Sequence, residues 1–137
     1  MATFISHSPA ETEAFAASLG AGLPHGSVIG LSGELGAGKT QFVKGLARGL
    51  RLTDRVHSPT FALLNIYSHG PVPLFHLDLY RLETTGQIVA AGLEEYFTPQ
   101  GISVVEWFER WQGPEPACVR RFDLQILNET GRSISYE

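Results

Sequence analysis

The most specific chemical pattern in the chain is an eight-residue stretch, residues 33–40. It has the sequence GELGAGKT and fits the phosphate-binding pattern G-x-x-x-x-G-K-[ST] at every fixed position. Glycines allow a backbone to approach a polyphosphate and turn its N–H groups inward, because they lack Cβ and accept positive φ. Lys39 would add a flexible point charge for the β- and γ-phosphates, and Thr40 a hydroxyl for Mg²⁺. The stretch therefore predicts a nucleotide-phosphate site.

The segments on either side of this loop have the composition of a strand and a helix. Residues 28–31 form a short apolar run, as expected of the strand before such a loop. After the loop, apolar residues recur at helical spacing on one face: Phe42, Val43, Leu46, Ala47 and Leu50. A Gly-rich turn with an exposed lysine would not need this context. The positive end of the helix would add to the attraction for phosphate.

Two acidic residues each end an apolar run that predicts a strand. Asp78 follows residues 72–77, and Glu106 follows residues 102–105. A nucleotide site needs a carboxylate at the end of a buried strand, near the loop threonine. Glu106 follows the cleaner apolar run, so we favour it on the magnesium side, directly or through a water. Asp78 could order a water, hold the metal's shell or bond Thr40, and either acid could instead face solvent.

Other candidate site residues are suggested by their position relative to the loop and to the predicted strands. Thr60, in Ser58-Pro59-Thr60, follows the loop's helix, where a threonine senses the γ-phosphate in several nucleotide hydrolases, although an ordinary turn fits equally well. Trp107 could stack on a base or a partner, or lie partly in the core. Five histidines lack metal-ligand spacing and are expected to be surface or packing residues: His7, His25, His57, His69 and His76.

The remaining sequence predicts one α/β domain over residues 1–137. A helix begins where Ser8, Pro9 and Glu11 form a start signal, and it runs to about residue 19. Strands are expected at 3–6, 61–67, 72–78, 102–106, 119–127 and 133–136, and short helices at 84–90 and 93–97. Residues 61–78 should form a β-hairpin, as should the last two strands. We expect a P-loop NTPase-like fold, with a mostly parallel central sheet, an antiparallel hairpin edge and helices on both faces.

Composition excludes several classes of protein. The 137 residues suffice for a core without disulfides, and 43% hydrophobic with 18% charged residues indicates a globular protein. A net charge of −4 argues against unaided nucleic-acid binding. No apolar run is long enough for a membrane span, and the first residues lack a signal-peptide pattern. With a single cysteine, Cys118, we expect a cytoplasmic protein without membrane contact.

Together these segments resemble the TsaE family, the small bacterial ATPases of tRNA threonylcarbamoyladenosine biosynthesis. The resemblance covers nearly the whole chain and is carried by GELGAGKT (33–40), HSPTF (57–61), FHLDLYRLE (75–83), GLEEYF (92–97) and VVEW (104–107). It implies ATP and Mg²⁺ as cofactors and slow hydrolysis by the protein alone. It also implies two partners, a threonylcarbamoyl transferase of the Kae1/Qri7 type and its inactive paralogue. Through them it would meet tRNA, whose adenosine 37 is modified in tRNAs that read codons beginning with A.

The resemblance also implies roles for single residues. Residues 36–41 would wrap the phosphates, Thr40 and Glu106 would serve Mg²⁺, Thr60 would be a switch residue, and Asp78 would be needed for hydrolysis. Residues expected near the nucleotide or nucleoside also include Trp107, Thr12 and Arg132. The full expected site comprises Thr12, Gly33, Gly36, Ala37, Gly38, Lys39, Thr40, Gln41, Thr60, Asp78, Glu106, Trp107 and Arg132. Two positions depart from the family: Gln41 where Thr or Ser is frequent, and Phe108 where proline is common.

Two other functions share a phosphate-binding loop. A small-molecule kinase would need an acceptor pocket and a lid with arginines, and no Arg-rich lid run is present. A nucleotide-dependent interaction module would bind ATP tightly without turning it over.

Overall fold

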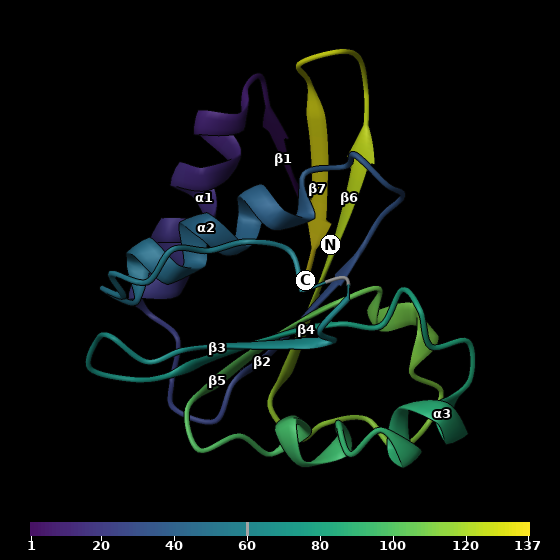
Figure 1. Cartoon of the computed structure of the whole chain (residues 1–137). Coiled ribbons are helices and arrows are strands. Elements are labelled where there is room, and N and C mark those ends of the chain that lie inside the picture. Colours follow the sequence, from purple (N-terminus) through teal and green to yellow (C-terminus); the bar gives the residue numbers. More distant parts are fainter. Residues whose placement is uncertain (60) are drawn as a thin grey trace.

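The computed structural model describes residues 1–59 and 61–137 (Figure 1). The strands are β1 (Ala2–Ser6), β2 (Val28–Ser32), β3 (Leu64–Tyr67), β4 (Leu74–Asp78), β5 (Ile102–Glu106), β6 (Val119–Ile126) and β7 (Arg132–Tyr136). The α-helices are α1 (Pro9–Ala21), α2 (Lys39–Gly49) and α3 (Thr85–Ala90), and two 3₁₀ turns are η1 (Glu94–Phe97) and η2 (Phe108–Arg110). Within these described ranges, no helix combines the length and the apolar character needed to cross a membrane.

All seven strands form one sheet in the order β1-β7-β6-β2-β5-β4-β3. The four central strands, β6, β2, β5 and β4, are parallel. β3 pairs antiparallel with β4 at one edge, and β7 and β1 continue the other side in antiparallel pairs. The predicted α/β class is thus confirmed, with its parallel centre and hairpin edge. The pairing of β1 with β7 is an addition that the sequence did not indicate.

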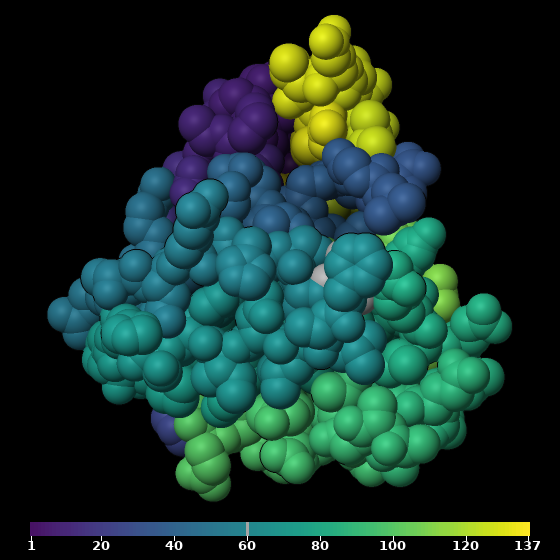
Figure 2. All heavy atoms as spheres, viewed as in Figure 1, coloured from purple at the N-terminus to yellow at the C-terminus, as the bar shows by residue number. Residues whose placement is uncertain are grey.

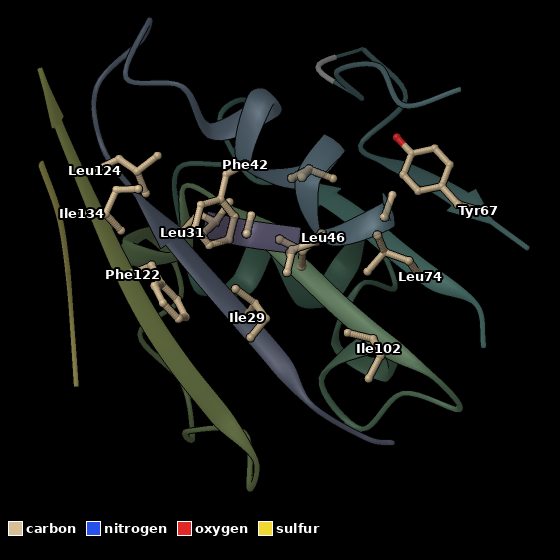
Figure 3. Close-up of a cluster of buried hydrophobic side chains, with 14 of the residues drawn as sticks. Ile29, Leu31, Phe42, Leu46, Tyr67, Leu74, Ile102, Phe122, Leu124 and Ile134 are labelled. Carbon is tan, nitrogen blue, oxygen red and sulfur yellow. The ribbon is translucent and has the colours of Figure 1, made fainter. Parts of the chain in front are cut away.

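Alternate residues of the central strands face two separate cores. On β2, Ile29 and Leu31 face α1 and α2, whereas Val28 faces the side covered by α3, η1 and η2. Figure 1 shows α1 and α2 on one side of the sheet and α3 on the other. Figure 3 shows the core under α2, where Phe42 and Leu46 lie over side chains of β2, β5 and β6. β2 and β5 are buried on both faces, which explains why their segments are mostly apolar.

Both strands of the first hairpin begin later than the sequence predicts. The first hairpin strand begins at Leu64 and not at residue 61, because Leu63 adopts a left-handed conformation with φ 69°. The Leu63 N–H donates to the carbonyl of Pro59 at 2.7 Å, which closes a turn before the strand. The second hairpin strand begins at Leu74, two positions later than expected. By contrast, the predicted N-cap at Ser8 is present, since its Oγ accepts from the Glu11 N–H at 3.1 Å.

The helices α1 and α2 approach closely because glycines lie at their contact. A Cβ built on Gly45 would lie 2.2 Å from the carbonyl oxygen of Glu13, and one on Gly49 would lie 2.1 Å from that of Ala17. Neither distance is possible without moving a helix backbone. The two glycines therefore set the depth at which α2, which follows the phosphate-binding loop, sits against α1.

We expect Gly45→Ala to lower the free energy of unfolding by about 1–3 kcal/mol, the usual range for overpacking a core. The helix propensity gained, roughly 1 kcal/mol, is too small to offset a clash with backbone. Urea denaturation would measure the change. Gly86→Ala is the matched control, since its Cβ would meet only Thr84 Oγ1 at 3.9 Å. Equal stability of both variants would show that α1 can shift freely on α2.

Candidate functional site

The loop of residues 33–38 joins the end of β2 to the start of α2. Gly33, Gly36 and Gly38 have φ values of 145°, 83° and 97°, which other residues rarely adopt. At Gly33 a Cβ would also lie 2.5 Å from the carbonyl oxygen of Leu124 on β6. Gly38 is the N-cap of α2, so the positive end of the helix dipole lies at the loop. This is the backbone geometry of an anion-binding loop.

Lys39 is folded over the loop and is only 5% exposed. Its Nζ donates to the carbonyl oxygens of Gly33 and Glu34, the latter at 2.9 Å. The same atom lies 4.3 Å from the ring centroid of Trp107, a cation–π contact. Burial lowers the pKa of Lys39, and nearby carboxylates, Glu106 foremost, oppose that shift. The ammonium is therefore a weakly hydrated charge placed to meet an anion.

A cavity of about 880 Å³ opens beside the loop. Its lining residues are Leu35, Gly36, Gly38, Lys39, Thr40, Gln41, Ser58, Asp78, Tyr80, Arg81, Glu83, Glu106 and Trp107. In Figure 2 the loop, drawn in blue, lies at the surface between the yellow hairpin joining β6 to β7 and the teal segments that follow α2. The structure thus brings together eight of the expected site residues: Gly36, Gly38, Lys39, Thr40, Gln41, Asp78, Glu106 and Trp107.

Both candidate carboxylates lie at the carboxyl ends of neighbouring parallel strands. Asp78 on β4 and Glu106 on β5 are register partners, and they are 3% and 4% exposed. Neither is a solvent-facing acid, so that alternative is wrong. Asp78 Oδ1 accepts from the N–H of Tyr80 at 2.9 Å. The two acids face the loop because the ends of parallel strands meet at one edge of the sheet.

The donor set of the cavity fits magnesium. The hydroxyl of Thr40 and the carboxylates of Asp78 and Glu106 are oxygen ligands of the kind Mg²⁺ prefers, and all three residues line the cavity. Across residues 1–59 and 61–137, no three His, Cys, Asp or Glu side chains form a preformed metal cluster. Mg²⁺ sites commonly combine one or two carboxylates with substrate phosphates, which matches this arrangement.

Trp107 forms one wall of the cavity. It links β5 to η2 in a left-handed conformation with φ 59°, and its ring meets Tyr80 edge-to-face at 5.0 Å between centroids. The Arg110 guanidinium lies 5.6 Å from the Trp107 ring centroid. The next residue, Phe108, fills the space above Gly30, where a Cβ would lie 2.4 Å from its ring. The family departure at Phe108 is therefore accommodated by a glycine in β2.

Four expected site residues that the structure describes lie outside the cavity lining: Thr12, Gly33, Ala37 and Arg132. Thr12 is buried in α1, and its Oγ1 lies 2.7 Å from Ser6 Oγ. Arg132 holds the loop from β7, where Nη2 donates to the carbonyl of Gly36 at 3.1 Å. Ala37 is buried inside the loop. The roles of Thr12 and Arg132 near a nucleoside stay predictions.

Gly33 likewise supports the loop from below, against the backbone of Leu124. Thr60 lies outside the described residues, so its predicted switch role has no structural account.

The sequence pointed neither to His76 nor to Tyr80, Arg81 and Glu83 of the cavity lining. His76 is fully buried, so of the two expectations, surface or packing, only the surface one is wrong, and its Nε2 lies 2.5 Å from Glu106 Oε2. Its Nδ1 lies 2.8 Å from the hydroxyl of Tyr67. Strand periodicity could have found it, because residues two apart on a strand share a face and Asp78 follows His76 by two.

Comparison with known proteins agrees with this architecture. The family model described as "Threonylcarbamoyl adenosine biosynthesis protein TsaE" matches residues 6–134. The chain is 48% identical over 99 residues to the tRNA threonylcarbamoyladenosine biosynthesis protein TsaE of Bacillus subtilis, covering 72% of this chain and 61% of that protein. It is 39% identical over 131 residues to the protein of the same name from Treponema pallidum, covering 96% of each. The match thus spans less than two thirds of the Bacillus relative and nearly all of the Treponema relative.

A solved structure shows the same fold. The crystal structure of Bacillus subtilis YdiB superposes with a TM-score of 0.78 at 33% sequence identity. The superposition covers 98% of this chain and 83% of that one.

Proposed function

Since the chain belongs to the TsaE family, we propose that it serves tRNA threonylcarbamoyladenosine biosynthesis as a Mg²⁺-dependent ATPase. The family supports the pathway. The residues around the cavity support the reaction type.

One observation carries the ATPase part of the proposal. A glycine-rich loop, a buried lysine and two buried carboxylates surround a single cavity at the carboxyl edge of a parallel sheet. Phosphoryl transfer needs little else from a protein, since its catalysis consists mainly of positioning and of stabilising charge. The cavity is also large enough for a nucleotide, as ligand pockets commonly range from about 300 to 1,000 Å³.

In this proposal each residue has a distinct task. The N–H groups of the loop and the start of α2 bind the phosphates, and Lys39 places its charge on the β- and γ-oxygens. Mg²⁺, held by Thr40 and Glu106, would neutralise phosphate charge. Asp78 or Glu106 orients the attacking water. The wall formed by Trp107 shields one side of the site.

The partners are part of the proposal. We place the protein in the cytoplasm with a threonylcarbamoyl transferase and its inactive paralogue, whose chemistry its ATP hydrolysis would drive or reset. A net charge of −4 favours contact with tRNA through that complex over direct binding.

Phosphate release from ATP would test the function. We expect slow release by the protein alone with Mg²⁺, loss of that release with excess chelator, and a strong change when the transferase pair and tRNA are added. Transfer of phosphate to an added small acceptor would favour a kinase. Tight ATP binding without phosphate release, even with partners, would favour an interaction module.

A further inference from the structure

Three neighbouring strands place a row of polar side chains on the sheet face that packs against α2. Glu106 comes from β5, His76 from β4 and Tyr67 from β3. Figure 3 shows Tyr67 with its hydroxyl at the margin of the apolar cluster under α2. Tyr67 is 3% exposed and His76 is fully buried. Buried polar groups of this kind are tolerated only when they bond to one another.

The hydrogen bonds between these side chains form a continuous chain. A carboxylate can only accept, so His76 Nε2 carries a proton and donates it to Glu106 Oε2 at 2.5 Å. His76 Nδ1 lies 2.8 Å from the Tyr67 hydroxyl oxygen, which is within hydrogen-bond distance. Burial raises the pKa of Tyr67, which keeps this hydroxyl protonated and able to donate. The Glu106 carboxylate is thus held by His76, a residue that does not line the cavity.

At the end of this series of hydrogen bonds, the Tyr67 hydroxyl contacts the backbone of His57. The Tyr67 hydroxyl donates to the His57 carbonyl oxygen at 3.1 Å, and its oxygen accepts from the His57 N–H at 3.4 Å. Asn65 Nδ2 also donates to the His57 carbonyl at 3.0 Å. The next residue, Ser58, lines the nucleotide cavity. One set of hydrogen bonds therefore joins two walls of the same cavity, the Glu106 wall and the Ser58 wall.

We propose that His76 and Tyr67 are positioning residues, which hold the Glu106 carboxylate in the orientation that binds Mg²⁺ and tie it to the segment 57–59. This inference rests on the proposed function, since it concerns the metal side of the same site. Second-shell partners of this kind fix the rotamer of a ligand, and their loss typically costs 10–100-fold in metal affinity or activity. Neither residue contacts the nucleotide in this proposal.

The test compares His76→Gln and Tyr67→Phe by the Mg²⁺ dependence of nucleotide binding, followed by tryptophan fluorescence, and by ATP hydrolysis. For His76→Gln we expect at least about tenfold more Mg²⁺ at half-saturation, with metal-free nucleotide affinity within about twofold of wild type. Tyr67→Phe should shift the same midpoint less and in the same direction. It removes one oxygen only, and Asn65 still satisfies the His57 carbonyl.

Tyr136→Phe is the matched control. Tyr136 packs against the same core and stacks on Phe122, with ring centroids 5.3 Å apart, but it lies outside the chain of bonds. It should leave the Mg²⁺ midpoint unchanged. If His76→Gln fails to fold, Tyr67→Phe decides the question.

The outcomes separate the two proposals. If the folded variants had a lower melting temperature but an unchanged Mg²⁺ midpoint, the hydrogen bonds of His76 and Tyr67 would serve stability alone. That result would overturn the inference. If the wild type binds Mg²⁺ and nucleotide without hydrolysing ATP, the ATPase proposal fails. A shifted midpoint in the variants would still support the positioning role.

Discussion

Replacing Lys39 with alanine is expected to reduce ATP hydrolysis by at least about 100-fold, the scale seen when one preorganised charge-stabilising donor is removed. The reason is its placement. Lys39 is buried over the loop, and among the described residues it is the lysine that lines the cavity. In a partly desolvated site a single charge interacts more strongly with phosphate than in water. Steady-state phosphate release with Mg-ATP would measure the effect.

The same substitution should leave the fold intact. Burial lowers the pKa of Lys39, so the folded protein holds this charge at some cost and loses little stability without it. The carbonyl oxygens of Gly33 and Glu34, freed of their donor, border an open cavity that water can enter. Lys44→Ala, at an exposed position of the same helix, is the control and should hydrolyse ATP like wild type. Unimpaired nucleotide binding and turnover in Lys39→Ala would make the site assignment wrong.

The second large effect is expected for Glu106→Gln, which we predict to lower Mg²⁺-dependent hydrolysis by about 100-fold or more. Glutamine keeps the size of the side chain and an oxygen that can accept from His76 Nε2. It removes the negative charge that a hard cation requires. Hydrolysis measured over a range of Mg²⁺ concentrations should show a raised midpoint as well as a lowered maximum.

Glu109→Gln separates local charge from ligation. Glu109 also raises the pKa of Lys39 through its charge, but it is exposed and does not line the cavity. It should retain nearly full hydrolysis. If Glu109→Gln and Glu106→Gln lose activity equally, the effect comes from the electrostatic field around Lys39, and Glu106 is not a ligand.

Much of this site could be predicted from sequence because its signals are local. The loop follows a fixed sequence pattern, and the strand before it and the helix after it flank it directly. Asp78 and Glu106 were identified because each ends an apolar run, and parallel strands align their carboxyl ends without further information. The two cores follow in the same way from alternating side chains on buried strands.

The contacts that could not be predicted depend on register between distant segments. His76 meets Tyr67 and Glu106 only because β3, β4 and β5 pair as they do, and a slip of one residue would turn His76 to the other face. Arg132 reaches Gly36 across 96 positions of sequence. The late start of β3 is set by the left-handed conformation of Leu63, which apolar composition does not reveal.

The central place of β2 in the sheet has a consequence for biosynthesis. β2 ends at Ser32, but its two neighbours, β5 and β6, begin at Ile102 and Val119. β1 stays unpaired for longer still during synthesis, because its partner β7 begins only at Arg132. On the ribosome the phosphate-binding loop therefore emerges long before any strand that supports it. Pairings between distant segments form slowly and leave strand edges open meanwhile. Under the proposed function, the nascent chain would have a complete nucleotide site only after β6 has been made, since β6 supports the loop at Gly33.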